Sequence, residues 1–263
     1  MAHIEFTETT IGNLAFERDG RLWGSLVQDG ATFKRIADKF RKAPGAIRCS
    51  NKWCRRVSWP IERCVNPVEA SYYQGWWDLI NTRCIAVVGA RKVTDEGKRR
   101  TRKLVKSLVA DGFTIVSGLA EGVDTVAHQT AIEHNGYTIG VIGTPLSQAY
   151  TRDNTALQRL IREEYLLVSQ VPFKKYHEQD YRSNKSFFPE RNITMSALTE
   201  ATIIVEGSDT SGTLYQARAA LNQGRRLFIL DSCFQNPSIE RPDRFAKKGA
   251  IRVRDYEDTI RNL

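Results

Sequence analysis

From residue 83 onward, short apolar runs alternate with amphipathic segments of helical spacing. We expect strands at 84–89, 113–117, 138–142, 166–169, 201–206, 226–230 and 250–253. We expect helices near 95–110, 123–134, 154–164, 191–199, 212–222 and 255–262. Continuous apolar strands separated by helices are typical of a parallel sheet that helices cover on both faces. The pattern therefore predicts an α/β fold with a doubly wound, mostly parallel sheet of about seven strands.

The pattern before residue 60 differs from the pattern of the sheet region. Phe33, Ile36 and Phe40 recur at helical intervals, Pro44 marks a break, and a second basic helical segment follows. Two short helices joined by a tight turn indicate a helix-turn-helix within a small, mainly helical, winged-helix-like domain. We therefore expect a basic domain at 1–60, a linker at 61–82 and the α/β domain at 83–263.

Most of the net charge lies in this N-terminal region. The chain has a formal net charge of +9, and residues 34–56 contribute nine Lys or Arg and one Asp. A concentrated basic segment favours a nucleic-acid partner, whereas the alternative is a solvated helix face. In a helix-turn-helix the second helix enters the major groove of duplex DNA. The candidate duplex-binding residues are Lys34, Arg35, Arg48, Lys52, Arg55 and Arg56.

The amino-acid composition argues against a membrane-spanning or secreted protein and against a zinc site. No apolar stretch approaches the roughly 18 residues of a membrane span, and the first ten residues lack a signal-peptide pattern. We expect a cytoplasmic protein with reduced cysteines and no membrane partner. Cys49, Cys54 and Cys64 cluster, but with no second pair and no nearby histidine their spacing is poor for zinc. We expect no metal and no cofactor.

Doubly wound sheets bind ligands at the carboxyl ends of their strands, so the turns after the strands are the candidate sites. Three turns combine glycines with small polar or basic residues, which lets backbone N–H groups approach a phosphate. The candidates are Gly89, Arg91 and Lys92 in the first turn, Ser117, Gly118 and Gly122 in the second, and Gly143, Thr144 and Asn154 in the third.

Two ionisable residues follow the second turn. Asp124 suits the N-cap of the next helix. We interpret His128, on the first turns of that helix, as a packing or hydrogen-bonding residue and not as a general base.

Two later segments extend the candidate site. Lys185, Phe188, Arg191 and Asn192 combine cations with aromatic rings, which suits single-stranded nucleic acid; the alternative is a loop-to-helix junction with buried phenylalanines. The residues 211–213 open a helix with hydroxyls and unbonded N–H groups, which predicts a further anion cradle formed by Ser211, Gly212 and Thr213.

Several segments, in order, resemble the Rossmann-like core of the DNA-processing protein A family (DprA/Smf). They are "VVGARK", "VSGLAEGVDTVAH", "VIGTPL…Y…N", "FPERN", "IIVEGSDTSGTLYQAR" and "ALNQGRRLF". The resemblance covers about residues 83–235 and implies a non-enzymatic single-stranded DNA binder that mediates recombination and often forms a homodimer. It places Arg91, Lys185, Arg191 and Asn192 in the family's pocket. It also implies that Gly118, Gly122, Gly143, Ser211, Gly212 and Thr213 form the phosphate-cradling turns.

Two other functions stay open. The core could bind a nucleotide signal while the helix-turn-helix binds an operator. Alternatively, the chain could be a nucleotide phosphoribohydrolase similar to the cytokinin-activating LOG family, but Tyr215 and Gln216 stand where an acid is wanted. We therefore assign no catalytic residue. A recombinase or toxin partner, in a mobile-element or defence setting, is a further hypothesis.

Overall fold

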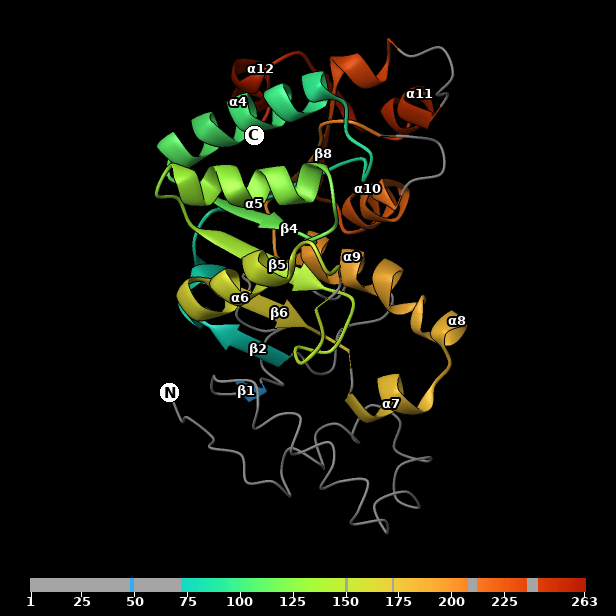
Figure 1. The fold of residues 1–263 in the computed structure, drawn as a ribbon. Coiled ribbons are helices and arrows are strands. Elements are labelled where there is room, and N and C mark those ends of the chain that lie inside the picture. Colours follow the sequence, from blue (N-terminus) through green and yellow to red (C-terminus); the bar gives the residue numbers. More distant parts are fainter. Residues whose placement is uncertain (1–47, 50–71, 150, 172, 208–211, 236–240) are drawn as a thin grey trace.

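The structure is a computed structural model that describes residues 48–49, 72–149, 151–171, 173–207, 212–235 and 241–263. Within these residues the sheet has nine strands in the order β1-β2-β6-β5-β4-β3-β7-β8-β9 (Figure 1). The parallel strands are β3 (Cys84–Val88), β4 (Thr114–Ser117), β5 (Thr138–Ile142), β6 (Leu166–Ser169), β7 (Ala201–Ile204), β8 (Arg226–Leu230) and β9 (Ile251–Val253). All seven predicted strands and the doubly wound α/β fold are therefore confirmed.

Two further strands extend the sheet at one edge. β2 (Tyr72–Gly75) pairs antiparallel with β6, and β1 (Arg48–Cys49) pairs antiparallel with β2. The sequence pattern did not predict β2, because four residues inside an aromatic-rich segment carry too little alternation. Arg48 and Cys49 form strand where we expected the recognition helix, because pairing with a sheet edge outweighs weak local helix propensity. The rest of the predicted helix-turn-helix lies outside the described residues.

The six predicted helices are present with small shifts at their ends. They are α4 (Asp95–Ala110), α5 (Val123–Glu133), α6 (Thr155–Glu164), α9 (Phe187–Ala197), α10 (Thr213–Asn222) and α12 (Tyr256–Arg261). Short helices that the pattern missed are α7 (Phe173–Glu178), α8 (Tyr181–Asn184), α11 (Arg241–Ala246) and the 3-10 turns η3 (Trp77–Asn81) and η4 (Asp231–Cys233).

The helices cover both faces of the sheet, and β3 shows how alternate residues divide between them. Ile85 and Val87 pack in the apolar cluster that includes residues of α4 and α5. Ala86 and Val88 pack in the cluster that includes residues of α9 and α10. All four side chains are buried, as expected for a central parallel strand.

The strand order reverses direction at β3. From β3 the chain continues to β4 on one side, whereas β7 pairs with β3 on the other side. Such a reversal leaves a crevice at the carboxyl ends of the two strands, which is the usual ligand position in this class of fold.

Candidate nucleic-acid interface

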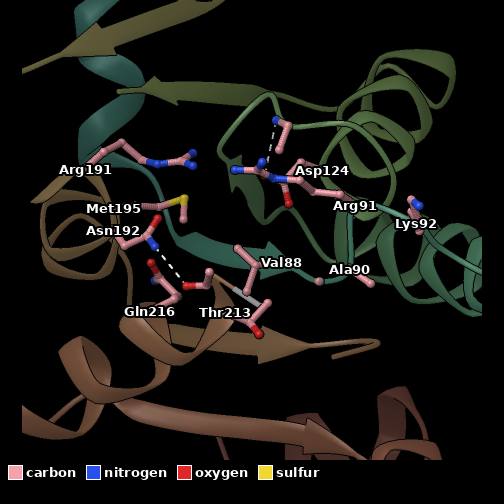
Figure 2. Close-up of a pocket in the computed structure, with 13 residues that line it drawn as sticks. Val88, Ala90, Arg91, Lys92, Asp124, Arg191, Asn192, Met195, Thr213 and Gln216 are labelled. Carbon is pink, nitrogen blue, oxygen red and sulfur yellow. Dashed lines mark hydrogen bonds between the residues drawn. The ribbon is translucent and has the colours of Figure 1, made fainter. Parts of the chain in front are cut away.

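A pocket of about 530 Å³ opens at the reversal point between β3 and β7. Figure 2 shows side chains from the turn after β3, from α5, from α9 and from α10 surrounding one space. The wall consists of Val88, Gly89, Ala90, Arg91, Lys92, Ala120, Asp124, Arg191, Asn192, Met195, Gly212, Thr213 and Gln216. Segments far apart in the sequence therefore meet at the position that the fold reserves for a ligand.

The turn that carries Arg91 and Lys92 is held in place by backbone contacts. Gly122 has a φ of +81°, and a Cβ there would lie 2.2 Å from the carbonyl oxygen of Ala90. The backbone N–H of Val123 donates to the same carbonyl at 3.2 Å. Gly122 thus supports the neighbouring turn, and its small size lets the two segments touch.

The same turn is fastened at its other end by Glu206. The Thr94 backbone N–H and hydroxyl donate to the Glu206 carboxylate at 3.0 and 2.7 Å, and Thr94 also accepts from the N–H of Gly97 as the N-cap of α4. A carboxylate at a helix N-terminus is favourable. Glu206 therefore has a structural partner at the edge of the site, while Arg91 and Lys92 stay exposed.

Arg191 is nearly buried in the pocket wall. Its Nη1 donates to the carbonyl of Val141 at 2.9 Å, and a Cβ on Gly118 would lie 1.5 Å from the same nitrogen. Asp124 is buried beside it and accepts from the N–H of Ala120 at 3.4 Å. Burial raises the pKa of the Asp124 carboxyl, and the positive charge of Arg191 opposes that shift. Gly118 therefore provides the space that a buried guanidinium needs.

The N-terminus of α10 forms the opposite wall. Gly212 is its N-cap residue, and the Asn192 side-chain N–H donates to the Gly212 carbonyl at 3.1 Å. Gln216 Nε2 donates to the Thr202 hydroxyl at 3.0 Å. Ser211 lies outside the described residues. N–H groups at a helix start, together with exposed cations, suit a phosphate, and the apolar side chains of Val88 and Met195 suit a flat ring.

Three of the predicted polar residues have internal partners instead. The Ser117 hydroxyl donates to the carbonyl of Val87 at 2.7 Å, and the Thr144 hydroxyl donates to that of Gln148 at 3.0 Å. Asn154 Nδ2 donates to the carbonyl of Leu119 at 3.0 Å. All three predicted residues are buried and lie outside the pocket lining, where they join neighbouring segments.

Of the predicted residues in the aromatic segment 185–192, some line the pocket and others do not. A Cβ on Gly143 would lie 2.7 Å from the Phe188 ring, so this glycine makes room for a half-buried phenylalanine. Lys185 is exposed, with its Nζ 4.7 Å from the centre of the Tyr181 ring. Neither Lys185 nor Phe188 lines the pocket, although Arg191 and Asn192 of the same segment do.

Residues 49–263 match the family described as DNA recombination-mediator protein A. The chain belongs to this family. Protein Smf of Escherichia coli (strain K12) is 36% identical over 195 residues, which cover 74% of this chain and 50% of that protein. The DNA processing protein DprA of Bacillus subtilis (strain 168) is 34% identical over 204 residues, which cover 77% of this chain and 67% of that protein. The chain thus spans about half the length of the Escherichia coli relative.

Solved structures of the DprA family share the fold. The X-ray structure of DNA processing protein A from Streptococcus pneumoniae has a TM-score of 0.73 at 26% identity, covering 96% of this chain and 86% of that one. The Helicobacter pylori protein, whose structure is described by its single-stranded DNA binding mode, has a TM-score of 0.65 at 27% identity, covering 77% and 90%.

Five residues of the pocket lining were not predicted from the sequence, and one predicted role was wrong. The five are Val88, Ala90, Ala120, Met195 and Gln216. Asp124 lies within the first turn of α5, whose N-cap is Gly122. Helical spacing could have found two of them, since Met195 follows Arg191 by four residues and Gln216 follows Thr213 by three. No local signal marks Ala120.

His128 is a buried structural residue, in agreement with the sequence interpretation. Its Nδ1 lies 2.7 Å from the Thr138 hydroxyl, and burial lowers its pKa to about 3. A neutral imidazole at physiological pH fits this buried position.

The remaining predictions concern residues that the structure describes little or not at all. Of the six candidate duplex-binding residues, only the backbone of Arg48 is described. Cys84 and Cys233 are free and buried, whereas the side chains of Cys49, Cys54 and Cys64 lie outside the described part. Among the described residues no group of His, Cys, Asp or Glu could hold a metal ion, and no helix is long and apolar enough to cross a membrane.

Proposed function

We propose that this chain binds single-stranded DNA in the pocket between β3 and β7 and acts as a DprA-type recombination mediator in DNA processing. The observation that carries the proposal is that one pocket brings together Arg91, Lys92 and Arg191 with the N-terminus of α10. The Helicobacter pylori relative is described as a single-stranded DNA binder, which supports the same ligand here.

The chemistry of the pocket suits a strand backbone bound with little sequence preference. Arg91 and Lys92 at the mouth neutralise phosphates, and the N–H groups of α10 add partial positive charge. Phosphate contacts give affinity and a strong salt dependence without reading bases.

The test compares two pairs of exposed cations. The Arg91→Ala, Lys92→Ala variant should bind single-stranded DNA at least about tenfold more weakly in fluorescence anisotropy. Its slope of log K against log salt should be shallower by about 1.4. The matched control is Lys247→Ala, Lys248→Ala, which removes the same charge from exposed residues outside the pocket lining. Equal affinities of the two variants would refute the pocket.

A mediator needs no catalytic group, and the site favours binding over hydrolysis. The Glu206 carboxylate accepts hydrogen bonds from Thr94, the N-cap of α4, and Tyr215 and Gln216 supply no carboxylate. Asp124 lies on the pocket wall but is nearly buried beside Arg191. We expect no free base when the protein is incubated with nucleoside monophosphates; release of base would instead favour the phosphoribohydrolase.

If the chain is instead a nucleotide-sensing regulator, we expect a different result when a mononucleotide competes with single-stranded DNA. If a mononucleotide is the ligand, it should displace single-stranded DNA at concentrations near its own Kd, whereas a strand binder should resist it. Duplex binding by the N-terminal basic residues, a homodimer and a recombinase or toxin partner stay proposals. A Lys52→Ala, Arg55→Ala, Arg56→Ala variant that keeps the affinity for duplex DNA would exclude the first of these.

A further inference from the structure

The turn at the pocket mouth continues directly into a strongly basic helix. Residues 91–106 contain eight Lys or Arg and two acidic residues, a net charge of +6. α4 begins beside the pocket after Lys92 and extends along the outside of the molecule toward the amino ends of the strands (Figure 1). Residues 34–56 are therefore not the chain's sole concentration of positive charge in the sequence.

The cations of α4 lie in one row on its outer face. The buried residues of the helix are Gly97, Thr101, Leu104, Val105 and Leu108. Arg99, Arg102, Lys103 and Lys106 are exposed and follow the spacing i, i+3, i+4, i+7, which aligns them on one side. We name these four residues the α4 basic row; it is about 10 Å long at 1.5 Å per residue.

Acidic partners neutralise only the first turn. Asp95 pairs with Lys98 at 2.9 Å, and Glu96 pairs with Arg99 and, at 3.3 Å, with Arg100. In the part of the chain that the structure describes, no ion pair involves Arg102, Lys103 or Lys106. A solvated helix that needs only solubility commonly alternates its charges, so a row without acids favours an anionic partner.

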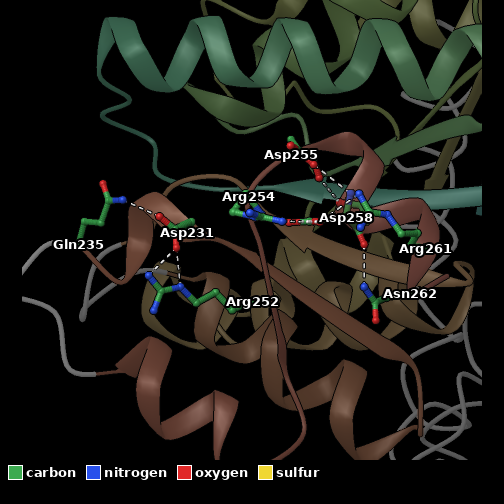
Figure 3. A network of polar contacts seen from close by, with 9 residues as sticks. Asp231, Gln235, Arg252, Arg254, Asp255, Asp258, Arg261 and Asn262 are labelled. Atoms are coloured by element: carbon green, nitrogen blue, oxygen red, sulfur yellow. Dashed lines mark hydrogen bonds and ion pairs between the residues drawn. The ribbon is translucent and has the colours of Figure 1, made fainter.

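The neighbouring helix α12 shows the contrast. Figure 3 shows cations in and just before this helix directed at an acid of the helix: Arg254, which precedes α12, contacts Asp258 at 2.7 Å, and Arg261 contacts Asp258 at 3.6 Å. The Tyr256 hydroxyl of α12 donates to Asp111, the C-cap residue of α4. The acidic Asp111 therefore lies at the far end of α4, and the basic surface lies between this end and the neutralised first turn beside the pocket.

We propose that the α4 basic row is a second DNA-binding surface, which holds the phosphates of a single strand as the strand leaves the pocket past Arg91 and Lys92. The inference rests on the proposed function of the pocket. Three observations carry it: the continuity of chain from the pocket to α4, the single face that the four cations share, and the missing ion pairs of three of them.

The test uses strand length. The full-length Arg99→Gln, Arg102→Gln, Lys103→Gln, Lys106→Gln variant is compared with Arg159→Gln, Arg226→Gln, Lys247→Gln, Lys248→Gln, which removes four exposed cations elsewhere. Glutamine keeps high helix propensity, and circular dichroism confirms folding. The ligands are a thymidine dinucleotide, which fills only the pocket, and an oligothymidylate several times longer than the row.

We expect the row variant to bind the long strand at least about tenfold more weakly, with a salt slope shallower by about 2 to 3. Its affinity for the dinucleotide should stay within about twofold of the control, because a dinucleotide held in the pocket does not contact the row and feels its charges only through screened attraction. Long-strand affinity equal to that of the control refutes the row and leaves the pocket intact. Should the row variant fail to fold, Arg102→Gln, Lys106→Gln gives the same comparison with half the slope change.

Failure of the proposed function looks different. If the unmodified protein binds neither ligand, or if the Arg91→Ala, Lys92→Ala variant binds both normally, the pocket is wrong and the inference falls with it. Equal losses of dinucleotide and long-strand binding in the row variant would also overturn the inference, because they indicate a general effect on the pocket.

Discussion

The turns after β3 and β5 have similar sequences and different roles. Each follows a buried apolar strand with a glycine and a polar residue, Gly89 with Arg91 and Gly143 with Thr144. After β3 the arginine stays exposed at a pocket. After β5 the Thr144 hydroxyl donates to Gln148, and the glycine faces the Phe188 ring. A glycine-rich turn is therefore a candidate site only where the fold leaves it open.

Strand order explains the difference. β3 lies between β4 and β7, so chain segments leave it in both directions and a crevice remains. β5 lies between β4 and β6, and residues of α9 cover the end of this strand: Arg191 donates to the carbonyl of Val141. The same residue types therefore line an open pocket in one turn and join segments in the other.

The largest effect should come from filling the contact between the two glycine turns. Gly122→Ala places a Cβ 2.2 Å from the Ala90 carbonyl at a φ of +81°. We expect it to lower the free energy of unfolding by about 3 kcal/mol and to weaken DNA binding by displacing Arg91. Chemical denaturation and anisotropy measure the two effects.

Gly112→Ala is the matched control for that prediction. Gly112 has a φ of +78°, but nothing lies within 4 Å of its added Cβ. It should cost only the conformational strain, about 1 kcal/mol, with unchanged DNA affinity. Equal costs at both positions would show that the contact between the turns is unimportant.

A second comparison uses two buried asparagines. Asn154 Nδ2 donates to Leu119, whereas Asn192 Nδ2 donates to Gly212 at the pocket wall. Asn154→Ala should destabilise the protein by about 1–3 kcal/mol, because the buried carbonyl of Leu119 loses its donor. Asn192→Ala should cost less, because Gly212 is exposed and water can replace the lost donor. Only Asn192→Ala should also weaken DNA binding, measured under conditions where both variants are folded. A loss of affinity in Asn154→Ala would place the third turn in the site.

The pH dependence of the free energy of unfolding should report the burial of His128. Since burial lowers the pKa of His128 from 6.5 to about 3, the unfolded chain binds an extra proton between these values. The His128 contribution is fully present above pH 6.5 and is lost as the pH falls toward 3. In the His128→Gln variant, the midpoint of chemical denaturation should therefore change less between pH 6.5 and pH 4 than it does in the unmodified protein. Parallel curves would contradict a buried neutral imidazole.

The smallest effect should come from Lys185. It is exposed, sits over the Tyr181 ring and does not line the pocket. Lys185→Ala should weaken binding of a dinucleotide by less than about twofold, since a cation outside the site contributes only screened attraction. A tenfold loss would mean that the bound strand extends along α8.

Local periodicity determined the core elements of this protein. The helix at 95–110 is α4 with the predicted bounds, and each predicted strand is present, because apolar spacing reports burial one residue at a time. The strand β2 was not predicted, because it forms by pairing with β6, which is a long-range contact.

The sequence predicted which residue types form the candidate site, but it did not determine which of the candidate residues line the pocket. Arg91, Lys92, Arg191 and Asn192 belong to residue types that suit phosphate, and all four line the pocket. Ser117, Thr144 and Asn154 belong to similar types and are buried elsewhere. Only the order of the strands and the contacts between their turns decided which polar groups face solvent, because that choice depends on residues far away in the chain.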